Sequence, residues 1–245
     1  MRATATATVA GGDGAVWLSD VRSQPPLTLR RSGGRLLVVG SAAGPVGGDE
    51  LHLDLCVAAG AVVRIGTAAA TMVWPGPSGA QSTMCVTIDV GADAHLEWHP
   101  CPTISVVGSN HRMSTVVRLG PGATCRVVEE LGLGRGDEES GLLDASVRIE
   151  RSRTPVVHHR ERFGPGVPGW GSTTAVASAR FVHQEFLVGR AARTARTIVD
   201  ETGAAAALPM AADVTAILAA GRNRPAVQAL LALCVDQSTL GSTMV

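Results

Sequence analysis

Three segments of the chain align with one another without a gap, and each consists of two alternating runs joined by a glycine-containing turn. The segments are Leu51–Ile65 "LHLDLCVAAGAVVRI", Met84–Trp98 "MCVTIDVGADAHLEW" and Met113–Val127 "MSTVVRLGPGATCRV". Placing Val57, Val90 and Leu119 in register also aligns an alanine after each turn. Alternation of apolar and polar residues with period two is typical of strands that bury one face. Each unit therefore predicts two β-strands connected by a short turn.

The alternation also identifies the side chains that we expect to point into the core. They are Leu53, Leu55, Val57, Ala61, Val63 and Ile65 in the first unit, Val86, Ile88, Val90, Ala94, Leu96 and Trp98 in the second, and Thr115, Val117, Leu119, Ala123, Cys125 and Val127 in the third. One such unit cannot bury its own apolar face, so the units must pack against one another. This requirement favours a β-solenoid, or a barrel or sandwich of hairpins. Leu27–Val39 is a candidate for an earlier, degenerate copy.

The last third of the chain changes character. From Val147 the pattern continues as short strands, interrupted by the loop Gly164–Gly171 "GPGVPGWG". Two later segments, Asp213–Ala220 and Pro225–Val235, carry apolar residues at helical spacing. The expected fold is mainly β, a β-helix-like stack of strands with about two C-terminal α-helices. We expect one domain over 1–245, with an N-terminal strand region (1–25), a repeat body (26–190) and a C-terminal region with helices (191–245).

The composition excludes some classes of partner. Lysine plus arginine and aspartate plus glutamate both number 21, so no overall field attracts nucleic acid or an anionic membrane. The five cysteines are widely spaced without a C-x-x-C pair, which is typical of reduced thiols in a cytoplasmic protein. The alternating Ala and Thr after Met1 do not form the apolar core of a secretory signal, and no apolar run is long enough to span a bilayer. We therefore expect a cytoplasmic protein that binds neither nucleic acid nor membrane.

The glycine-rich stretch "GPVGGDE" at Gly44–Glu50 resembles a phosphate loop only superficially. It lacks the lysine and hydroxyl that hold a triphosphate and its magnesium, and Asp49 would repel phosphate. The segment His95–His99 "HLEWH" places two imidazoles and Glu97 on one face of a predicted strand. Such a row could offer two ligands to nickel or zinc, or it could be an ordinary solvated face. His158 and His159 lie on opposite strand faces, which argues against chelation by that pair alone.

No catalytic signature is present in the sequence. A stand-alone cupin-like metal enzyme is the alternative function class, but it needs a His-x-His pair that the chain lacks. A nucleophile elbow G-x-S-x-G is absent as well. These absences favour a binding or scaffold protein, without catalytic residues, over an enzyme.

Four separated blocks, in order, resemble one known family. They are "GPVGGDELHLDLCVAAGA", "TAAATMVW", "LEWHPCPTISV" and "EELGLGRG". Together they are similar to the urease accessory protein D family, called UreD or UreH, from about Gly44 to Arg162. Met72, Trp74 and Cys101 depart from the family pattern, as does the acidic run Asp137–Glu139.

The resemblance implies a non-catalytic chaperone that binds the urease apoprotein together with UreF-like and UreG-like proteins. In this family nickel is brought to urease, so any bound Ni²⁺ would be transient and no tightly bound cofactor is expected. Matched block by block, the resemblance implies that Asp49, Glu97, Glu129 and Glu161 contact nickel in passage. Two local alternatives remain open: Asp49 could cap backbone N–H groups of its own turn, and Glu129 could pair with Arg135.

Overall fold

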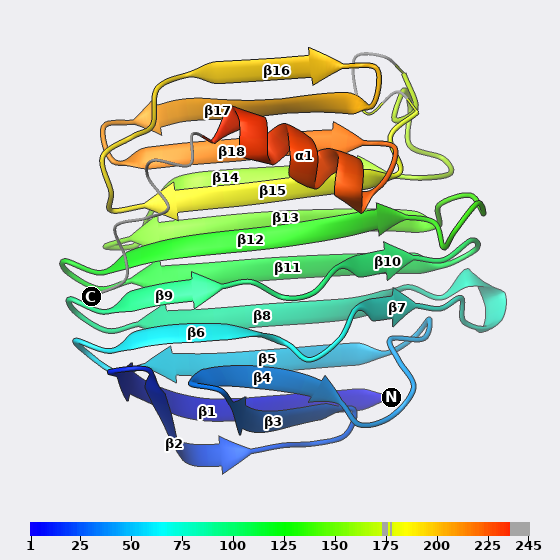
Figure 1. Ribbon diagram of the computed structural model, residues 1–245. Coiled ribbons are helices and arrows are strands. Elements are labelled where there is room, and N and C mark those ends of the chain that lie inside the picture. The colour runs from blue at the N-terminus through cyan, green and yellow to red at the C-terminus, as the bar shows by residue number, and fades with distance from the viewer. Residues whose placement is uncertain (173–175, 177, 236–245) are drawn as a thin grey trace.

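The computed structural model describes residues 1–172, 176 and 178–235, which form two facing β-sheets with one α-helix outside them (Figure 1). Sheet A contains, in spatial order, β14 (Thr154–Phe163), β13 (Leu142–Arg151), β11 (Asn110–Leu119), β8 (Ser82–Val90), β5 (Glu50–Val57), β1 (Arg2–Gly12) and β2 (Ala15–Arg22). Sheet B contains β16 (Arg196–Asp200), β17 (Gly203–Ala211), β18 (Val214–Gly221), β15 (Phe181–Val188), β12 (Thr124–Leu133), β9 (His95–Trp98), β6 (Val62–Thr67), β4 (Arg35–Gly40) and β3 (Leu27–Ser32). Two short strands, β7 (Thr71–Val73) and β10 (Thr103–Ser105), join sheet B beside β12, and Pro77–Gly79 forms a 3₁₀ turn.

The repeat units form stacked coils. Each unit runs along sheet A, crosses at the turn and returns along sheet B, and successive coils pair in parallel. Val57 pairs with Val90, which pairs with Leu119, so the register predicted from the sequence is confirmed. The middle of the molecule is therefore a β-solenoid, and antiparallel strands close it at both ends.

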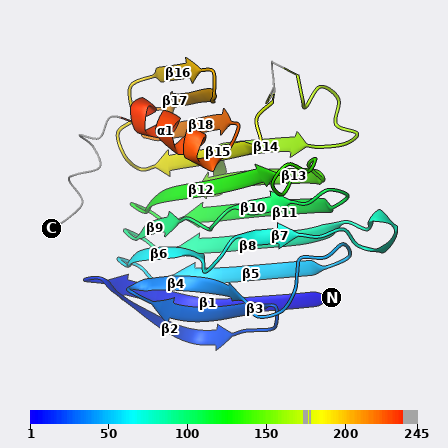
Figure 2. The ribbon, with the colours of Figure 1, turned by 45° about the vertical axis from the view of Figure 1, so that its right-hand side comes forward.

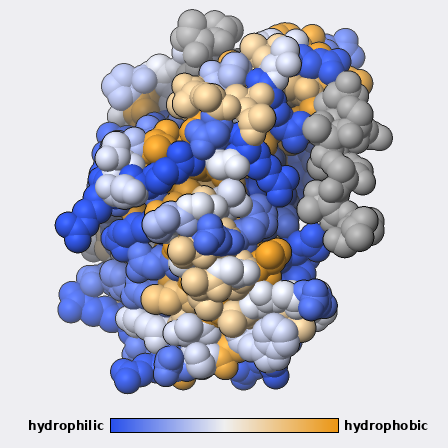
Figure 3. All heavy atoms as spheres, turned by 90° about the vertical axis from the view of Figure 1, so that its left-hand side faces the viewer, coloured by the Kyte–Doolittle hydropathy of each residue, from blue (hydrophilic) through white to orange (hydrophobic). Residues whose placement is uncertain are grey.

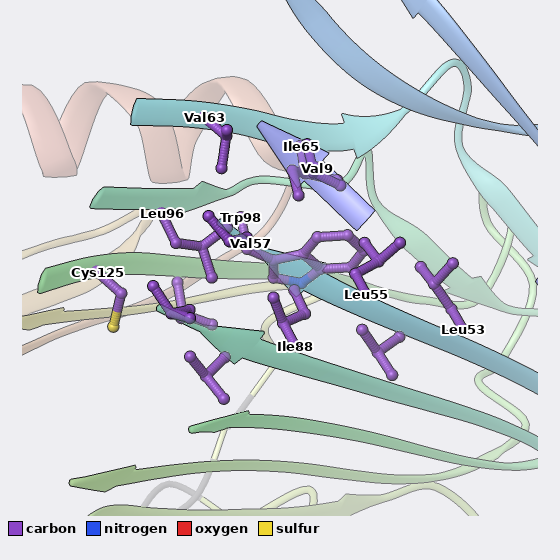
Figure 4. Packing of buried hydrophobic residues seen from close by; sticks show 14 of the residues in the cluster. Val9, Leu53, Leu55, Val57, Val63, Ile65, Ile88, Leu96, Trp98 and Cys125 are labelled. Atoms are coloured by element: carbon purple, nitrogen blue, oxygen red, sulfur yellow. The ribbon is translucent and has the colours of Figure 1, made fainter. Parts of the chain in front are cut away.

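The inward rows predicted from the alternation are all buried. They meet the inward side of β1 and β15 in one core between the sheets. In Figure 4 the indole of Trp98 lies among aliphatic side chains that come from both sheets, Val9, Leu55, Val57, Ile65, Ile88 and Leu96. Complete burial of one Leu, Ile or Val side chain stabilises the fold by about 1.5–3 kcal/mol, so this core is the main source of stability.

The turns between the sheets stack closely on one side of the molecule. A Cβ on Gly91 would lie 2.6 Å from the amide nitrogen of Ala59, and one on Gly120 would lie 2.9 Å from that of Ala92. Glycine is therefore required where one turn touches the next. Apolar residues form a pale orange band through the lower half of this side, flanked by hydrophilic residues (Figure 3).

The first sixth of the chain closes one end of the stack. β1 lies parallel to β5 and pairs in an antiparallel hairpin with β2. Leu27–Val39 does not form an earlier copy of the repeat, because β3 and β4 are a hairpin that lies entirely in sheet B. Its second strand, β4, still pairs in parallel with β6, so the hairpin caps the stacked coils.

The C-terminal region contains one helix in its described part, and the prediction of a helix at Asp213–Ala220 is wrong. This segment is β18, because its residues alternate between two buried surfaces: Val214 and Ala216 face the core between the sheets, whereas Ile217 packs beneath the helix. An apolar residue at nearly every position hides the period of two.

The second predicted helix is confirmed as α1 (Arg224–Cys234). Asn223 caps it by accepting a hydrogen bond of 2.9 Å from the amide of Ala226, and Pro225 lies in its first turn. Its apolar side covers the outer face of sheet B at β15, β17 and β18. Among residues that the structure describes, no helix is long and apolar enough to cross a bilayer.

We predict that Gly47→Ala destabilises the fold by about 1–3 kcal/mol through overpacking. A Cβ at this position would lie 2.4 Å from the carbonyl oxygen of Ala80 and 2.5 Å from the amide nitrogen of Gly76, and neither backbone can move freely. Urea unfolding followed by circular dichroism measures the loss. The matched control is Gly40→Ala, whose Cβ meets no atom within 4 Å and should change stability by less than about 0.5 kcal/mol. Equal effects of the two substitutions would contradict the close contact.

Candidate functional site

A cavity of about 370 Å³ lies between the two sheets. It forms where sheet B is interrupted: the chain leaves the sheet after β6 and after β9, and rejoins it at β7 and β10 (Figure 1). Pro100 and Pro102 lie in the second interruption, and proline cannot donate the amide hydrogen bond that a continuous strand needs. The small side chains of Ala68–Ala70 line the first interruption. The gap faces the first halves of β5, β8 and β11.

The wall of the cavity is mostly apolar, with a few polar groups at its inner end. Apolar lining comes from Leu53, Met72, Met84, Val86, Trp98 and Met113. The polar lining residues that are buried are His111, Thr115 and Glu129, and the partly exposed Thr67, Thr71, Thr103 and Ser114 complete the polar lining. Burial lowers the pKa of His111 to about 4, and its Nδ1 lies 2.8 Å from the hydroxyl of Ser82, so the ring is neutral at physiological pH.

Glu129 is the ionisable group of this cavity that titrates near neutral pH. It continues the inward row of β12 after Cys125 and Val127, and its side chain is fully enclosed. Burial raises its pKa to about 7, although two donors favour the ionised form. These donors are the hydroxyl of Thr115, 2.6 Å from Oε1, and the indole N–H of Trp98, 3.3 Å from the same oxygen.

The partners of Glu129 are neutral, and none of the ion pairs among the described residues includes it. The expected alternative of a Glu129–Arg135 pair is wrong, since Arg135 lies over the ring of Trp74, 5.5 Å from its centroid. A buried carboxylate without a cationic partner exchanges its proton readily for another positive charge. The carboxyl group of Glu129 can therefore take up or release a proton near neutral pH.

A second polar group lies beside Glu129 inside the molecule. Gln184 on β15 is the residue paired with Glu129 across the β12–β15 ladder, and its amide donates a hydrogen bond to Glu161 on β14. Glu161 also lies 3.5 Å from Nε2 of His159. Two atoms here, Oε1 of Gln184 and Nε2 of His159, are buried without a hydrogen-bond partner. Thus the structure brings Glu161 and Glu129 to the same interior, connected through Gln184.

Asp49 has a local role. Its Oδ2 accepts a hydrogen bond of 2.9 Å from the amide of Val46, and Oδ1 lies 2.8 Å from the α-ammonium group of Met1. Burial opposes ionisation, but these hydrogen bonds outweigh it and lower the pKa of Asp49. The carboxylate therefore closes its own turn, as the first local alternative expected. Asp49 lies apart from the cavity lining, although Gly44 and Pro45 of the same turn belong to it.

Glu97 lies on the opposite face of sheet B from Glu129. It pairs with Nε of Arg64 at 3.1 Å and with Nη1 of Arg126 at 3.0 Å. His95 is on the same face, as the alternation predicted, and its Nδ1 lies 2.7 Å from the hydroxyl of Thr124. Burial is the main cause of a lowered pKa for His95. Of the four predicted nickel contacts, therefore, only Glu129 and Glu161 share the interior.

A buried ionic cluster on the outer face of sheet B was missed by the sequence reasoning. Glu185 on β15 receives two hydrogen bonds of 2.9 Å from the guanidinium of Arg126, and lies 3.4 Å from Nε2 of His183. Burial opposes its ionisation, but these partners lower the pKa of Glu185 to about 2. Glu130 is 3.7 Å from Nδ1 of His183, and Arg224 of α1 donates to it at 2.8 Å. The cluster therefore ties α1 to the sheet.

The sequence signal for this cluster was weak because its members are far apart in the chain. Arg126 and Glu185 are separated by 59 residues, and Glu130 and Arg224 by 94. The alternation His183-Gln184-Glu185 next to an apolar run was the available hint. In the described part of the chain, no three His, Cys, Asp or Glu side chains are placed to hold a metal ion. A cupin-like metal centre, which needs such a group, therefore has no counterpart among these residues.

Comparison with known proteins gives a consistent match. A family model described as "UreD urease accessory protein" matches residues 2–243. The chain is 37% identical over 193 residues to urease accessory protein UreD 2 of Saccharopolyspora erythraea, covering 77% of this chain and 68% of that protein. It is 34% identical over 240 residues to urease accessory protein UreD of Streptomyces coelicolor, covering 94% of both chains. It is also 36% identical over 195 residues to urease accessory protein UreD of Streptomyces avermitilis, covering 77% of each.

We predict that Glu129→Gln becomes increasingly stabilising, relative to the native chain, as the pH rises from about 4.5 to about 7. The folded pKa of Glu129 lies above its ordinary value, so between these pH values the native chain still holds a proton that the unfolded chain has released. The stability of the native fold therefore falls over this range and levels off above the folded pKa. The integrated loss is about 3 kcal/mol. Urea unfolding of both proteins at several pH values measures it. A stability difference that does not change with pH would contradict an uncompensated carboxylate.

We predict that Arg126→Leu lowers stability by about 3 kcal/mol, because Glu185 is left buried without its guanidinium partner. Arg64→Leu is the matched control, since Arg64 pairs with Glu97 at the surface and keeps 60% of its side chain exposed. Such an exposed pair contributes less than about 1 kcal/mol. Thermal unfolding followed by circular dichroism compares the two, and similar losses would show that the cluster does not stabilise the sheet.

Proposed function

Because the chain belongs to the UreD urease accessory protein family, we propose that it is a non-catalytic scaffold needed for nickel insertion into the urease apoprotein. It acts in the cytoplasm, in a complex with UreF-like and UreG-like proteins. In this proposal nickel is cargo that passes through, and the chain keeps no tightly bound metal.

The observation that carries the proposal is the cavity that ends at Glu129. A cargo site needs a group that can take up a divalent cation and then release it. The Glu129 carboxyl suits this role because its pKa of about 7 makes proton and cation close competitors at physiological pH. Oxygen ligands without softer donors hold Ni²⁺ weakly, which allows the metal to leave.

A second carboxylate, that of Glu161, lies farther along the inner side of the sheets from Glu129. From Glu129 the side chain of Gln184 leads to Glu161 and His159. The Oε1 atom of Gln184, which is buried without a hydrogen-bond partner, is an acceptor of the type that a hydrated cation or its water shell needs. We propose that Glu129 and Glu161 are successive transient contacts, whereas Asp49 supports the turn and Glu97 supports the outer face of sheet B.

We predict that deleting the gene leaves urease assembled but poor in nickel, and that Glu129→Gln in the restored gene lowers the nickel content of urease roughly tenfold or more. Glutamine keeps the acceptor for Thr115 and Trp98 but cannot exchange a proton for a cation. The measurement is metal analysis of purified urease, with urease activity alongside. Glu97→Gln is the matched control on the other face of the sheet, and it should load urease normally.

Co-purification with the UreF-like protein and the urease subunits shows whether each variant still assembles. Fully loaded urease in the deletion strain would refute the maturation role. A Glu129→Gln variant that assembles and loads urease normally would leave the scaffold role but remove the passage through the cavity.

A further inference from the structure

The two sheets do not end at the same level. Sheet A ends at β14, whereas sheet B continues past β15 through β18, β17 and β16 (Figures 1 and 2). β14 lies opposite β15, because the ring of His159 is 5.5 Å from that of Phe186 and Glu161 bonds Gln184. Beyond β14, the inner side of the last strands of sheet B therefore faces no strand of sheet A in the described ranges.

We call this uncovered surface the overhang. Its apolar members are Val199 on β16, Ala204, Ala206 and Leu208 on β17, and Leu218 on β18, and Thr197 of β16 lies on the same side. Leu218 packs against the core between the sheets, and the ladder register places the other four on the same side. The opposite side of β17 is different, since Ala205 and Ala207 are buried beneath α1.

The overhang is apolar and exposed. Val199 keeps 71% of its surface in contact with solvent, and Leu208 keeps 40%. A sheet face of this kind is normally covered by another layer. In this molecule the layer opposite sheet B is sheet A, and one further strand beside β14 would continue that layer.

The edge of β14 can receive such a strand. β13 occupies one side of β14, and the other side is the edge of sheet A. Pro155 stands at the start of β14, so it removes no N–H group from the stretch between Val156 and Phe163. Along that stretch the N–H groups that do not point to β13, about every other one, are directed to the edge and can bond a new strand. A strand added there would lie about 4.8 Å from β14 and about 10 Å from sheet B, the spacing of two packed sheets. Its inner side chains would cover the overhang.

The charged side chains beside this edge determine what kind of segment can bind there. On the outer face of sheet A, the single carboxylate of Asp144 is shared by three guanidinium groups. These belong to Arg160 at 2.6 Å, Arg112 at 3.4 Å and Arg162 at 3.9 Å. One negative charge among three positive ones leaves a local excess of positive charge. A second copy of the chain paired at the same edge would bring its own β14 arginines against these, which is unfavourable.

We propose that the edge of β14 and the overhang form a docking site for an extended segment of a partner protein, with apolar side chains on one face and acidic side chains on the other. The segment adds to β14 as a further strand of sheet A, its apolar residues cover the overhang and its carboxylates meet the arginines. Backbone pairing supplies affinity, and the alternation of side chains supplies specificity. Although β14 also carries Glu161, none of its residues lines the cavity at Glu129, and binding of a partner segment at this edge goes beyond the proposed delivery of nickel.

The test uses the full chain and a peptide of about eight residues in which valine and glutamate alternate, long enough for one strand. We expect the peptide to slow hydrogen exchange at the amides of Val156–Phe163. A peptide with lysine in place of glutamate should bind at least about tenfold more weakly. Val199→Glu on the overhang and Arg162→Glu beside the edge should each weaken binding of the glutamate peptide about tenfold. We expect both variants to fold, because both native side chains are largely exposed and Asp144 keeps Arg160 and Arg112 when Arg162 is replaced. Circular dichroism of each variant checks this.

Two control variants match these substitutions elsewhere. Val62→Glu changes another exposed valine, on β6, and Arg22→Glu changes an exposed arginine on β2; both should leave the affinity within about twofold. The proposal is overturned if β14 gains no protection at ~1 mM peptide, if protection appears at β2 or β3 instead, or if both peptides bind equally. Concentration-dependent dimerisation that buries β14 would identify a second copy as the occupant and would also refute it.

Discussion

The architecture depends on one constraint: a pair of half-buried strands cannot cover its own apolar row. Each coil in the middle of this protein contributes one strand to each sheet, and its inward side chains are buried only when the coils above and below are in register. The close contact of Gly91 with Ala59, and of Gly120 with Ala92, keeps that register at the turns. The hairpins at the two ends then complete the core that the repeat leaves open.

The same constraint explains how much the sequence alone could predict. Strict alternation determined which face of each repeat strand is buried, and it also determines that Glu129 points inward, because it follows Val127 by two residues. The identical rule places Glu97 outside, next to the inward Leu96 and Trp98. The resemblance to a family selected both Glu97 and Glu129. Only the alternation along each strand shows that the two carboxylates lie on opposite faces of sheet B.

Other features were beyond sequence reasoning for physical reasons. β18 is apolar on both faces, since one faces the core and the other lies under α1, so its period could not distinguish strand from helix. The pairing of Arg126 with Glu185, and the meeting of Gln184 with Glu161, arise from antiparallel closure between segments remote in the chain. The cavity arises because sheet B is interrupted at residues 68–70 and 99–102. No pattern of residues in either segment alone predicts that the two interruptions lie side by side.

The stacked turns make the two sides of the molecule unequal in their tolerance of inserted residues. On the side of Gly91 and Gly120, neighbouring backbones touch, so an extra residue in any one turn would push apart every coil behind it. On the opposite side two connections are longer: eight residues join β7 to β8 and eight join β12 to β13, against four in each stacked turn. Adding residues to a loop of this length costs little conformational entropy. An inserted segment is therefore accommodated more easily in one of these longer connections than in a stacked turn, where it would separate the coils.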